Sequence, residues 1–291
     1  MPRAAIIGLV TTAVACVAIA AVLLFAGGGD EASGDSATLL VTQNFGSEPM
    51  IPAREVSIGT SPTVMRQLQS AAKIETQYGG RYVDSIDGII GDGVNDWLFF
   101  IDGTRSDLGA TSVKLRAGQM VQWDRHNWQA LRTGGAIVGA FPRPFKERGV
   151  AVKCVSGEAG CDLAKIRLKS LGVRAAGDGV PLYVGLWRDV AGEELPRKLT
   201  GDPVENGVYA APGKSGLRVI DDEGAVAREL GDGAGLVAAL GSGGKVAWIA
   251  TGTTPQAVEA AAGALQTDQL FSHFAVAVES RKTIPLPVTT P

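Results

Sequence analysis

The most apolar and aromatic stretch after the N-terminal segment is the run Trp-Leu-Phe-Phe-Ile at residues 97–101, followed by Asp102 and Gly103. The run is too short for a buried helix, and Asp-Gly is a common two-residue turn between strands. We therefore predict a central strand at residues 97–101 that enters a turn. Further strands of the same sheet are predicted at residues 38–45, 53–58 and 120–124.

One amphipathic helix is predicted between the second and the later strands. Ser61 supplies a capping hydroxyl, and Pro62 occupies the first helical position. Apolar residues then recur at the spacing of a helix face that covers a sheet, namely Val64, Met65, Leu68 and Ala72. Two strands, a helix and further strands are the order of a β-grasp domain, which we place at residues 38–132.

Residues 133–280 show a different pattern, in which strand signals alternate with single helices. Strands are predicted at residues 136–141, 150–154, 182–187, 245–250 and 274–278, and short strand signals occur within a glycine-rich region between residues 191 and 244. Helices are predicted at residues 163–171, with Asp162 as the cap, and at residues 256–265. The alternation predicts an α/β sandwich with a mixed sheet, so the whole chain falls in the α+β class. Residues 281–291 are rich in Pro and Thr and predict a disordered tail.

The first 26 residues predict a transmembrane anchor or a signal segment. Residues 4–26 contain no charged side chain, and about 20 apolar residues are enough to span a bilayer. Arg3 precedes this segment and favours an orientation that places everything after residue 27 outside the cytoplasm. A cleaved signal has an apolar core of only about 7–15 residues, so we favour an uncleaved anchor over a secreted product. Residues 27–37 are small and polar and predict a flexible tether.

Charge and metal-ligand content narrow the classes of function. The formal net charge is -3, so the totals offer no electrostatic reason to expect nucleic acid as a partner. With 2 His and 3 Cys, the chain has few of the side chains that metal sites use, and we predict no bound metal. Asp92, Asn95 and Asp96 lie close together, but calcium loops need more ligands at fixed spacing, so we interpret them as a solvated turn.

Cys154 and Cys161 are predicted to form a disulfide. They are seven positions apart, at the end of a predicted strand and just before a predicted helix. In an exported chain, two such cysteines usually pair. The alternative is a redox-active pair, which would usually have the C-x-x-C spacing that these residues lack.

The sequence shows no catalytic constellation. Residues 207–215 come close to a phosphate-binding loop, but five residues instead of four separate the glycines, and a strand-like run follows. The G-x-S-x-G nucleophile motif is absent. For an enzyme we retain Asp189, Asp221 and His273 as candidates for a hydrolase-type site, either in residues 133–280 or in a cleft between the two predicted domains.

Four segments in order carry a family resemblance. They are the helix start at residues 61–68, the segment Tyr-Gly-Gly-Arg-Tyr-Val-Asp-Ser-Ile-Asp-Gly-Ile at residues 78–89, the strand and turn at residues 97–103, and residues 115–123. Together they resemble a bacterial family of unknown function that is related to the C-terminal domain of transcobalamin and intrinsic factor, with a β-grasp, SLBB-like fold. Gln119 stands where that family usually has Asp, and Asp102 stands where Asn is common.

The resemblance implies a ligand surface. In the cobalamin carriers this domain closes over a corrinoid beside a large helical barrel, and nothing in this sequence corresponds to that barrel. Cobalamin or another corrinoid is therefore the ligand that kinship implies, and no other cofactor is predicted. We place the predicted ligand surface where Trp97, Phe99, Trp123 and Trp128 come together. His126 is interpreted as a surface residue beside a core Trp123.

These features together predict a membrane-tethered, non-catalytic binding module on the extracytoplasmic side of a bacterial cell membrane. Its expected partners are the membrane, a small molecule such as a corrinoid, and a membrane transporter of an uptake system. Two alternatives stay open. One is an extracytoplasmic hydrolase-type enzyme, and the other is a purely structural envelope protein.

Overall fold

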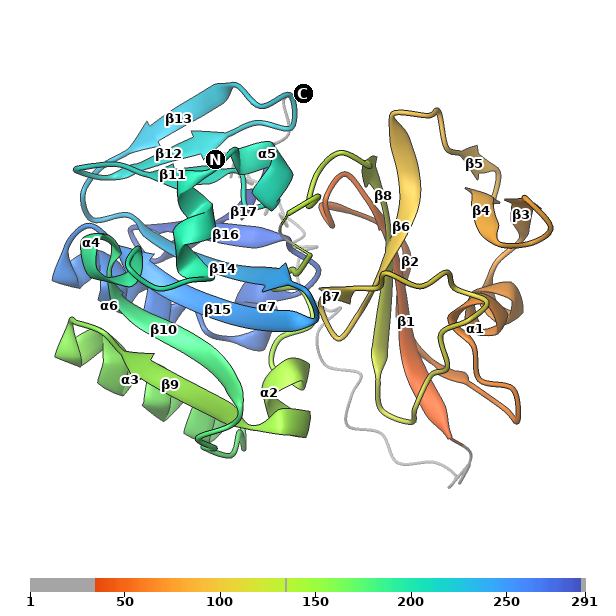
Figure 1. Cartoon of the computed structure of the whole chain (residues 1–291), viewed down its shortest axis with the longest axis horizontal. Coiled ribbons are helices and arrows are strands. Elements are labelled where there is room, and N and C mark those ends of the chain that lie inside the picture. Colours follow the sequence, from red (N-terminus) through yellow and green to blue (C-terminus); the bar gives the residue numbers. More distant parts are fainter. Residues whose placement is uncertain (1–34, 134, 289–291) are drawn as a thin grey trace, which may run out of the picture. The chain divides into compact units, whose positions relative to one another are not determined.

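Strands outnumber helices in the fold, which is mixed α+β with several sheets (Figure 1). The computed structural model describes residues 35–133 and 135–288, which belong to one compact unit, Gly34–Pro291. The predicted anchor at residues 1–26 and most of the predicted tether lie outside the described residues. Within the described ranges, no helix is both long and apolar enough to span a bilayer.

The first sheet has five strands in the order β2-β1-β8-β6-β7. They are β1 (Ser36–Gln43), β2 (Glu48–Ser57), β6 (Asn95–Ile101), β7 (Thr104–Arg105) and β8 (Met120–Asn127). β1 and β8 run parallel, whereas the other neighbours are antiparallel. The central strand is therefore β8. The aromatic run of β6 lies one place nearer the edge, which corrects the prediction that it forms the central strand.

Helix α1 (Val64–Ala71) contributes its apolar face to the core of the first sheet. Val64, Met65 and Leu68 are buried, as their helical spacing predicts. The helix begins two residues later than predicted, because the Thr63 hydroxyl accepts a hydrogen bond from the Arg66 N–H at 3.2 Å and caps it. A small sheet follows along the chain, made of β3 (Ile74–Gln77), β4 (Tyr82–Ile86) and β5 (Ile89–Ile90).

The second sheet has six strands in the order β17-β16-β14-β15-β10-β9. They are β9 (Val150–Cys154), β10 (Val180–Leu186), β14 (Gly235–Ser242), β15 (Lys245–Gly252), β16 (Ala275–Glu279) and β17 (Lys282–Leu286). β9, β10 and β15 are parallel, while β14, β16 and β17 are antiparallel to their neighbours. The sheet is therefore mixed, as the alternation of strands and helices predicts.

Both faces of the second sheet are covered, and β14 contributes to both cores (Figure 1). Val237 and Ala239 pack in one core with the helices α2 (Arg143–Arg148), α3 (Glu158–Ser170) and α6 (Pro255–Gly263). Leu236 and Ala238 pack in the opposite core with a third sheet, β11-β12-β13. The remaining elements are α4 (Trp187–Val190), η1 (Pro196–Thr200), α5 (Pro203–Asn206), β11 (Ala210–Pro212), β12 (Leu217–Ile220), β13 (Val226–Leu230) and α7 (Thr267–Leu270).

Residues 136–141, predicted as a strand, form a buried segment of turns instead. Its backbone groups bond to two different parts of the chain: the Ile137 N–H donates to the Gly103 carbonyl at 2.8 Å, and the Val138 N–H donates to the Phe274 carbonyl at 3.1 Å. The segment is apolar because it is enclosed between other elements. Its hydrophobicity therefore reflects burial rather than strand pairing.

The prediction of a disordered tail at residues 281–291 is wrong for residues 282–288. Lys282–Leu286 form β17 at the edge of the second sheet, and Val288 pairs with Asp221. The hairpin that leads into β17 uses Ser280 and Arg281, both with positive φ, where Asn-Gly is the usual signal. Pro285 is tolerated in β17 because an edge strand leaves one side of its backbone unpaired.

The carboxylate of Asp124, on β8, holds the turn that connects β1 to β2. It is fully buried and accepts four hydrogen bonds: from the Thr42 hydroxyl (2.6 Å), the Phe45 N–H (3.1 Å), the Gly46 N–H (2.8 Å) and His126 Nδ1 (2.8 Å). His126 is only 1% exposed, which corrects the prediction of a surface residue. Because Asp124 Oδ1 also accepts the Phe45 N–H, we assign the donor role in this pair to His126 Nδ1.

The turn that Asp124 holds packs against the segment before β16. The Phe45 ring lies 5.0 Å from the ring of Tyr209 and 5.2 Å from that of Phe274. The Ser272 hydroxyl donates to the Gly46 carbonyl at 2.9 Å. A Cβ atom at Gly46 would collide with the Ser272 carbonyl oxygen, and Gly46 also has a φ of +82°. Glycine is therefore required here by space as well as by backbone conformation.

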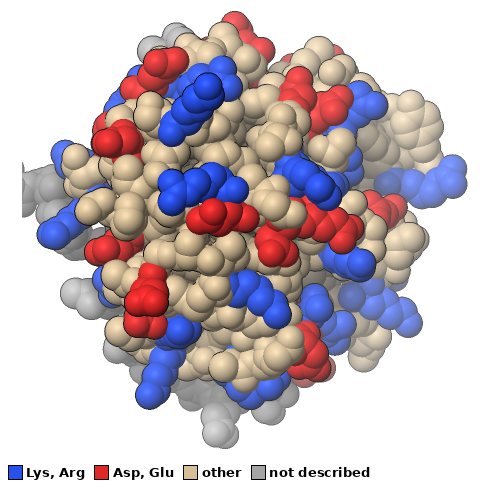
Figure 2. Space-filling model, turned by 60° about the vertical axis from the view of Figure 1, so that its left-hand side comes forward, with Lys and Arg blue, Asp and Glu red and all other residues tan. Residues whose placement is uncertain are grey.

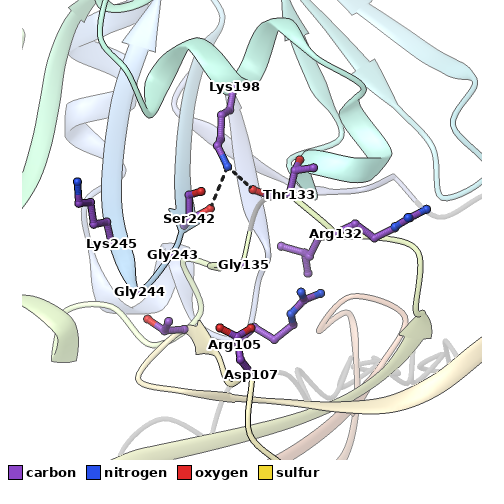
Figure 3. Close-up of a pocket in the computed structure, with 13 residues that line it drawn as sticks. Arg105, Asp107, Arg132, Thr133, Gly135, Lys198, Ser242, Gly243, Gly244 and Lys245 are labelled. Carbon is purple, nitrogen blue, oxygen red and sulfur yellow. Dashed lines mark hydrogen bonds between the residues drawn. The ribbon is translucent and has the colours of Figure 1, made fainter.

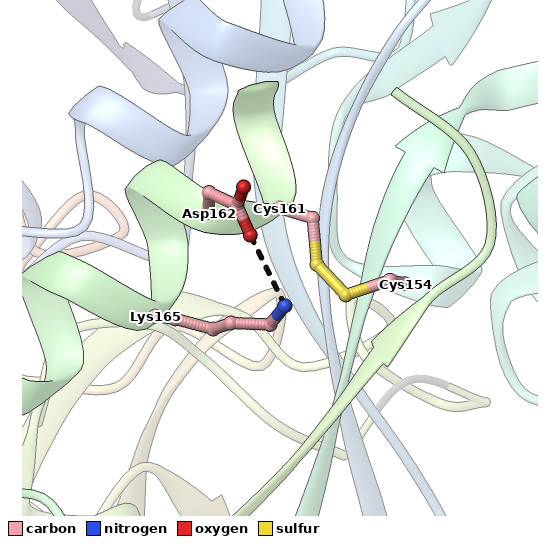
Figure 4. Close-up of a disulfide and its surroundings, with 4 residues drawn as sticks. All are labelled: Cys154, Cys161, Asp162 and Lys165. Atoms are coloured by element: carbon pink, nitrogen blue, oxygen red, sulfur yellow. Dashed lines mark hydrogen bonds and ion pairs between the residues drawn. A yellow bond between two sulfur atoms is a disulfide. The ribbon is translucent and has the colours of Figure 1, made fainter. Parts of the chain in front are cut away.

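The predicted disulfide between Cys154 and Cys161 is confirmed (Figure 4). Cys154 ends β9, and Cys161 lies in the first turn and a half of α3, because that helix begins at Glu158 rather than after Asp162. Asp162 is therefore not the cap. Its carboxylate instead pairs with Lys165 at 3.2 Å on the exposed side of the helix. The disulfide thus ties the edge strand of the second sheet to the helix that covers it.

We expect Asp124→Ala to lower the free energy of unfolding by about 3–5 kcal/mol, because it leaves the Phe45 and Gly46 N–H groups buried without an acceptor. Urea denaturation followed by tryptophan fluorescence measures the change. Asp178→Ala, at an exposed carboxylate, is the matched control and should change the stability by less than about 0.5 kcal/mol. Equal losses for the two variants would contradict the central role of Asp124.

We expect the double variant Cys154→Ser, Cys161→Ser to lose about 2.5 kcal/mol of stability, since the disulfide closes a short loop and restricts the unfolded chain only modestly. Chemical denaturation of wild type with and without dithiothreitol should show the same loss. The reductant should leave the double variant unchanged. A wild-type protein that is insensitive to the reductant would refute the contribution of the disulfide.

Candidate functional site

Three of the four predicted ligand-binding aromatic residues lie together in the core of the first sheet. Trp97, Phe99 and Trp123 are 4%, 9% and 2% exposed, and the rings of Phe99 and Trp123 are 5.0 Å apart. Trp128 lies outside this cluster, is 43% exposed, and donates from Nε1 to the Gly93 carbonyl at 3.2 Å. The four side chains therefore do not form one open surface in this structure, and their role in ligand binding stays a prediction.

The acidic segment after β5 is built as a turn. The Asp92 carboxylate accepts hydrogen bonds from the backbone of Asn95 (2.6 Å) and Val94 (2.9 Å), and it pairs with Arg125 at 2.8 Å. The backbone N–H groups of Asn95 and Val94 hold the pKa of Asp92 well below its ordinary value. Among the residues that the structure describes, no group of three His, Cys, Asp or Glu side chains is placed to hold a metal ion.

The three residues retained for a hydrolase-type site lie in separate elements. Asp221 accepts from the backbone of Glu223 (3.1 Å) and Ala225 (2.8 Å) in the turn between β12 and β13. Asp189 lies in α4, and His273 precedes β16. In the described part of the chain, no hydrogen bond or ion pair joins any two of these three side chains, so each is held by its own local structure.

A pocket of about 310 Å³ lies where four separate segments meet (Figure 3). Its walls come from β7, the segment at residues 131–135, η1 and the hairpin between β14 and β15. Four basic side chains line the pocket, namely Arg105, Arg132, Lys198 and Lys245. A single carboxylate, that of Asp107, lines it as well. The excess of positive charge makes this pocket a candidate site for an anion.

Lys198 and Arg105 extend into the pocket from opposite walls (Figure 3). Lys198 Nζ donates to the Thr133 carbonyl at 2.7 Å and to the Gly241 carbonyl at 3.4 Å, which fixes its position and leaves its third N–H available. Neither side chain forms an ion pair with a carboxylate in the described ranges. Both are only partly exposed, so their charges are incompletely solvated.

The hairpin wall of the pocket depends on two glycines. Gly243 and Gly244, between Ser242 and Lys245, have φ values of +55° and +77°, as the tight two-residue turn requires. A Cβ added at either position meets no other atom within 4 Å, so the backbone conformation and not the available space favours glycine here. Lys245 follows this turn directly and lines the pocket.

The sequence alone does not bring these basic residues together. Arg105, Arg132, Lys198 and Lys245 are spread over 140 positions and belong to no common motif. Figure 2 shows a face of the molecule on which Lys and Arg are interspersed with Asp and Glu. The local excess of positive charge arises only when the chain folds.

His273 is partly buried by the fold, less completely than His126. Its Nδ1 atom is buried and has no hydrogen-bond partner among the described residues. Burial lowers the pKa of His273 below its ordinary value of 6.5, because a charged imidazole there would be poorly solvated. His273 is therefore neutral at pH 7, which fits a packing role in front of β16.

The fold and the pocket define an α+β protein with a basic cavity, and one part of it matches a family model. Residues 61–127, which run from two residues before the α1 cap to the end of β8, match "Domain of unknown function (DUF4430)". This confirms the predicted relation of that part of the chain to a domain of unknown function. The match covers less than a quarter of the chain.

Among solved structures, the chain is similar to one titled "Crystal Structure of Haptocorrin in Complex with Cbi". The sequence identity is 15%, the TM-score is 0.25, and the similarity covers 34% of this chain and 27% of that chain. The match therefore spans only about a quarter of the length of haptocorrin. No curated protein matches the chain.

We expect wild type to lose more stability than His273→Gln when the pH falls from 7.5 to 5.0. The folded pKa of His273 lies below the unfolded value of about 6.5, so protons bind the unfolded chain preferentially and stability declines as the pH drops through 6.5. Urea denaturation at the two pH values measures the difference. Any contribution of His126 to the loss of stability is the same in wild type and in His273→Gln, so it cancels in the comparison. Identical losses would show that the burial of His273 does not determine the pH dependence.

Proposed function

We propose that this chain is a non-catalytic binding module and that its basic pocket takes a small anionic molecule. The observation that carries the proposal is the pair Lys198 and Arg105, two partly buried cations that face the same pocket without a carboxylate partner. A partly desolvated charge is costly unless it is paired, and an anionic ligand would supply the missing partner. Carboxylate and phosphate groups both match the donors that these side chains offer.

The size of the pocket limits what it encloses. At about 310 Å³ it stands at the lower end of the range for small-molecule sites, roughly 300–1,000 Å³. A compact anion fits inside, whereas a corrinoid macrocycle is too large for this pocket to enclose. We therefore propose a compact carboxylate or phosphate compound as the ligand. A corrinoid stays the alternative ligand, which the family resemblance implies.

The topology of the first sheet supports the kinship to the β-grasp domain of the cobalamin carriers. The strand order β2-β1-β8-β6, with β1 and β8 parallel in the middle and α1 packed on the sheet, matches that fold. We propose that residues 38–132 form this β-grasp domain and residues 133–280 a second, α/β domain. A shared topology does not imply that this chain binds the ligand of the related carriers, because ligand contacts depend on side chains.

We also propose that the module works on the extracytoplasmic side of the membrane, held there by residues 1–26. The uncharged run at residues 4–26 after Arg3 supports this location. The disulfide between Cys154 and Cys161 supports it independently, because such bonds persist in oxidising compartments. A membrane transporter that receives the ligand is the partner that this arrangement suggests.

We expect Arg105→Gln to weaken binding of an anion by about tenfold or more, because one charge-assisted hydrogen bond contributes about 1.5–3 kcal/mol. The measurement is calorimetric titration of the full chain in detergent with phosphate, citrate and a cobalamin analogue. Arg105 is preferred to Lys198 for the test, since the Lys198 ammonium also holds two backbone carbonyls. Lys146→Gln, at an exposed lysine of α2 outside the pocket, is the matched control.

Binding of citrate or phosphate that Arg105→Gln weakens and Lys146→Gln does not would support the proposal. Binding of the cobalamin analogue with the same sensitivity would support the corrinoid variant. A full chain that binds none of the three probes, or binds them equally well in both variants, would remove the basis for an anion site in this pocket.

A further inference from the structure

A second cavity, of about 620 Å³, shares no lining residue with the basic pocket. Its walls come from α3, from α6 and α7, and from the hairpin between β16 and β17. Arg167 and Arg281 line this cavity, and so does Glu259. Charges of both signs therefore face one space that is large enough for a small molecule.

Arg167 is held by α3 so that part of its guanidinium group is withdrawn from water. Its Nε atom is fully buried and has no hydrogen-bond partner within the described ranges. The side chain as a whole is only partly exposed, and no described carboxylate lies within ion-pair distance of it. A partly desolvated guanidinium group attracts an anion more strongly than a hydrated one, because the surroundings screen it less.

Arg281 has a positive φ at a turn position where glycine is the usual residue. Ser280 and Arg281 form the two-residue turn between β16 and β17, with φ values of 50° and 65°. Gly is the usual residue at the second position of such a turn, since a side chain there is strained. Arg281 is exposed and makes no hydrogen bond in the described structure that would compensate. Strain of this kind often marks a side chain with a function, and here that side chain borders the cavity.

Glu259, on α6, supplies the opposite charge. α6 packs against α3, yet no oxygen of Glu259 comes within 4.0 Å of a nitrogen of Arg167 or Arg281. The neighbouring Gln266 donates from Nε2 to the Gly263 carbonyl at 2.7 Å, which leaves its side-chain oxygen as an acceptor. The residues that line the cavity thus include two cationic donors, a carboxylate and a neutral acceptor.

We propose that this cavity is a second ligand site that binds a small zwitterion of the amino-acid or dipeptide class. The carboxylate of the ligand pairs with Arg167 and Arg281, and its ammonium group is accepted by Glu259. A simple anion such as phosphate would leave Glu259 without a partner, and a simple amine would leave the two arginines without one. The site does not depend on the function proposed for the basic pocket, because no residue is common to both.

The test is calorimetric titration of the full chain in detergent with alanyl-alanine. Two analogues each remove one charge of this probe: N-acetyl-alanyl-alanine lacks the ammonium group, and alanyl-alanine amide lacks the carboxylate. We expect alanyl-alanine to bind, and we expect each analogue to bind at least fivefold more weakly. Absence of alanyl-alanine binding, or equal binding of either analogue, would overturn the proposal.

Substitutions then locate the site. We expect Arg167→Gln to weaken alanyl-alanine binding at least tenfold, whereas Lys169→Gln, on the same helix and outside the cavity, leaves it unchanged. Arg281→Gly separates a role of Arg281 in ligand binding from a role in stabilising the fold. It should raise the Tm, because glycine relieves the turn, and it should also weaken binding. Binding that is unaffected by both Arg167→Gln and Arg281→Gly would exclude this cavity as the site.

Discussion

The packing of the first sheet against the second depends on the hydrogen bonds that the buried carboxylate of Asp124 accepts. Asp124 accepts hydrogen bonds from a hydroxyl, two backbone N–H groups and an imidazole, all at 3.1 Å or less, in a place that water does not reach. An ionised group there is stable only if its partners replace its hydration. The partners include the turn at Phe45 and Gly46, so the turn cannot move away without exposing a charge to an apolar core.

This constraint extends to the second sheet. The turn held by Asp124 inserts Phe45 among Tyr209 and Phe274, and the Gln122 side chain donates to the Ser272 carbonyl at 2.8 Å. The first and second sheets therefore meet through a packed aromatic cluster and not through a flexible link. The basic pocket lies in the same unit, and its walls include β7 of the first sheet and the β14–β15 hairpin of the second.

Much of the fold could be predicted from local patterns, and the exceptions have physical causes. The apolar positions from Val64 to Leu68 predict the buried face of α1 from neighbouring residues alone. In the same way, the short spacing of Cys154 and Cys161 predicts the disulfide. β14 was missed because it is buried on both faces, and its Gly and Ala residues have low strand propensity. The pairing of Asp124 with His126 and the convergence of Arg105 with Lys198 depend on long-range contacts, and no periodicity or spacing signals them.

The two departures from the family pattern show why single positions are hard to interpret without a structure. Asp102 replaces a common Asn and Gln119 replaces a usual Asp, and the structure brings them together: Gln119 Nε2 donates to Asp102 Oδ2 at 3.2 Å. The side chains at these two positions are therefore direct hydrogen-bond partners in this chain. Burial raises the pKa of Asp102, and the Met120 N–H, which donates to Asp102 at 2.8 Å, opposes that effect. Two positions that the sequence presents separately are therefore one hydrogen-bonded pair at the turn before β8, and only the folded chain shows that they act together.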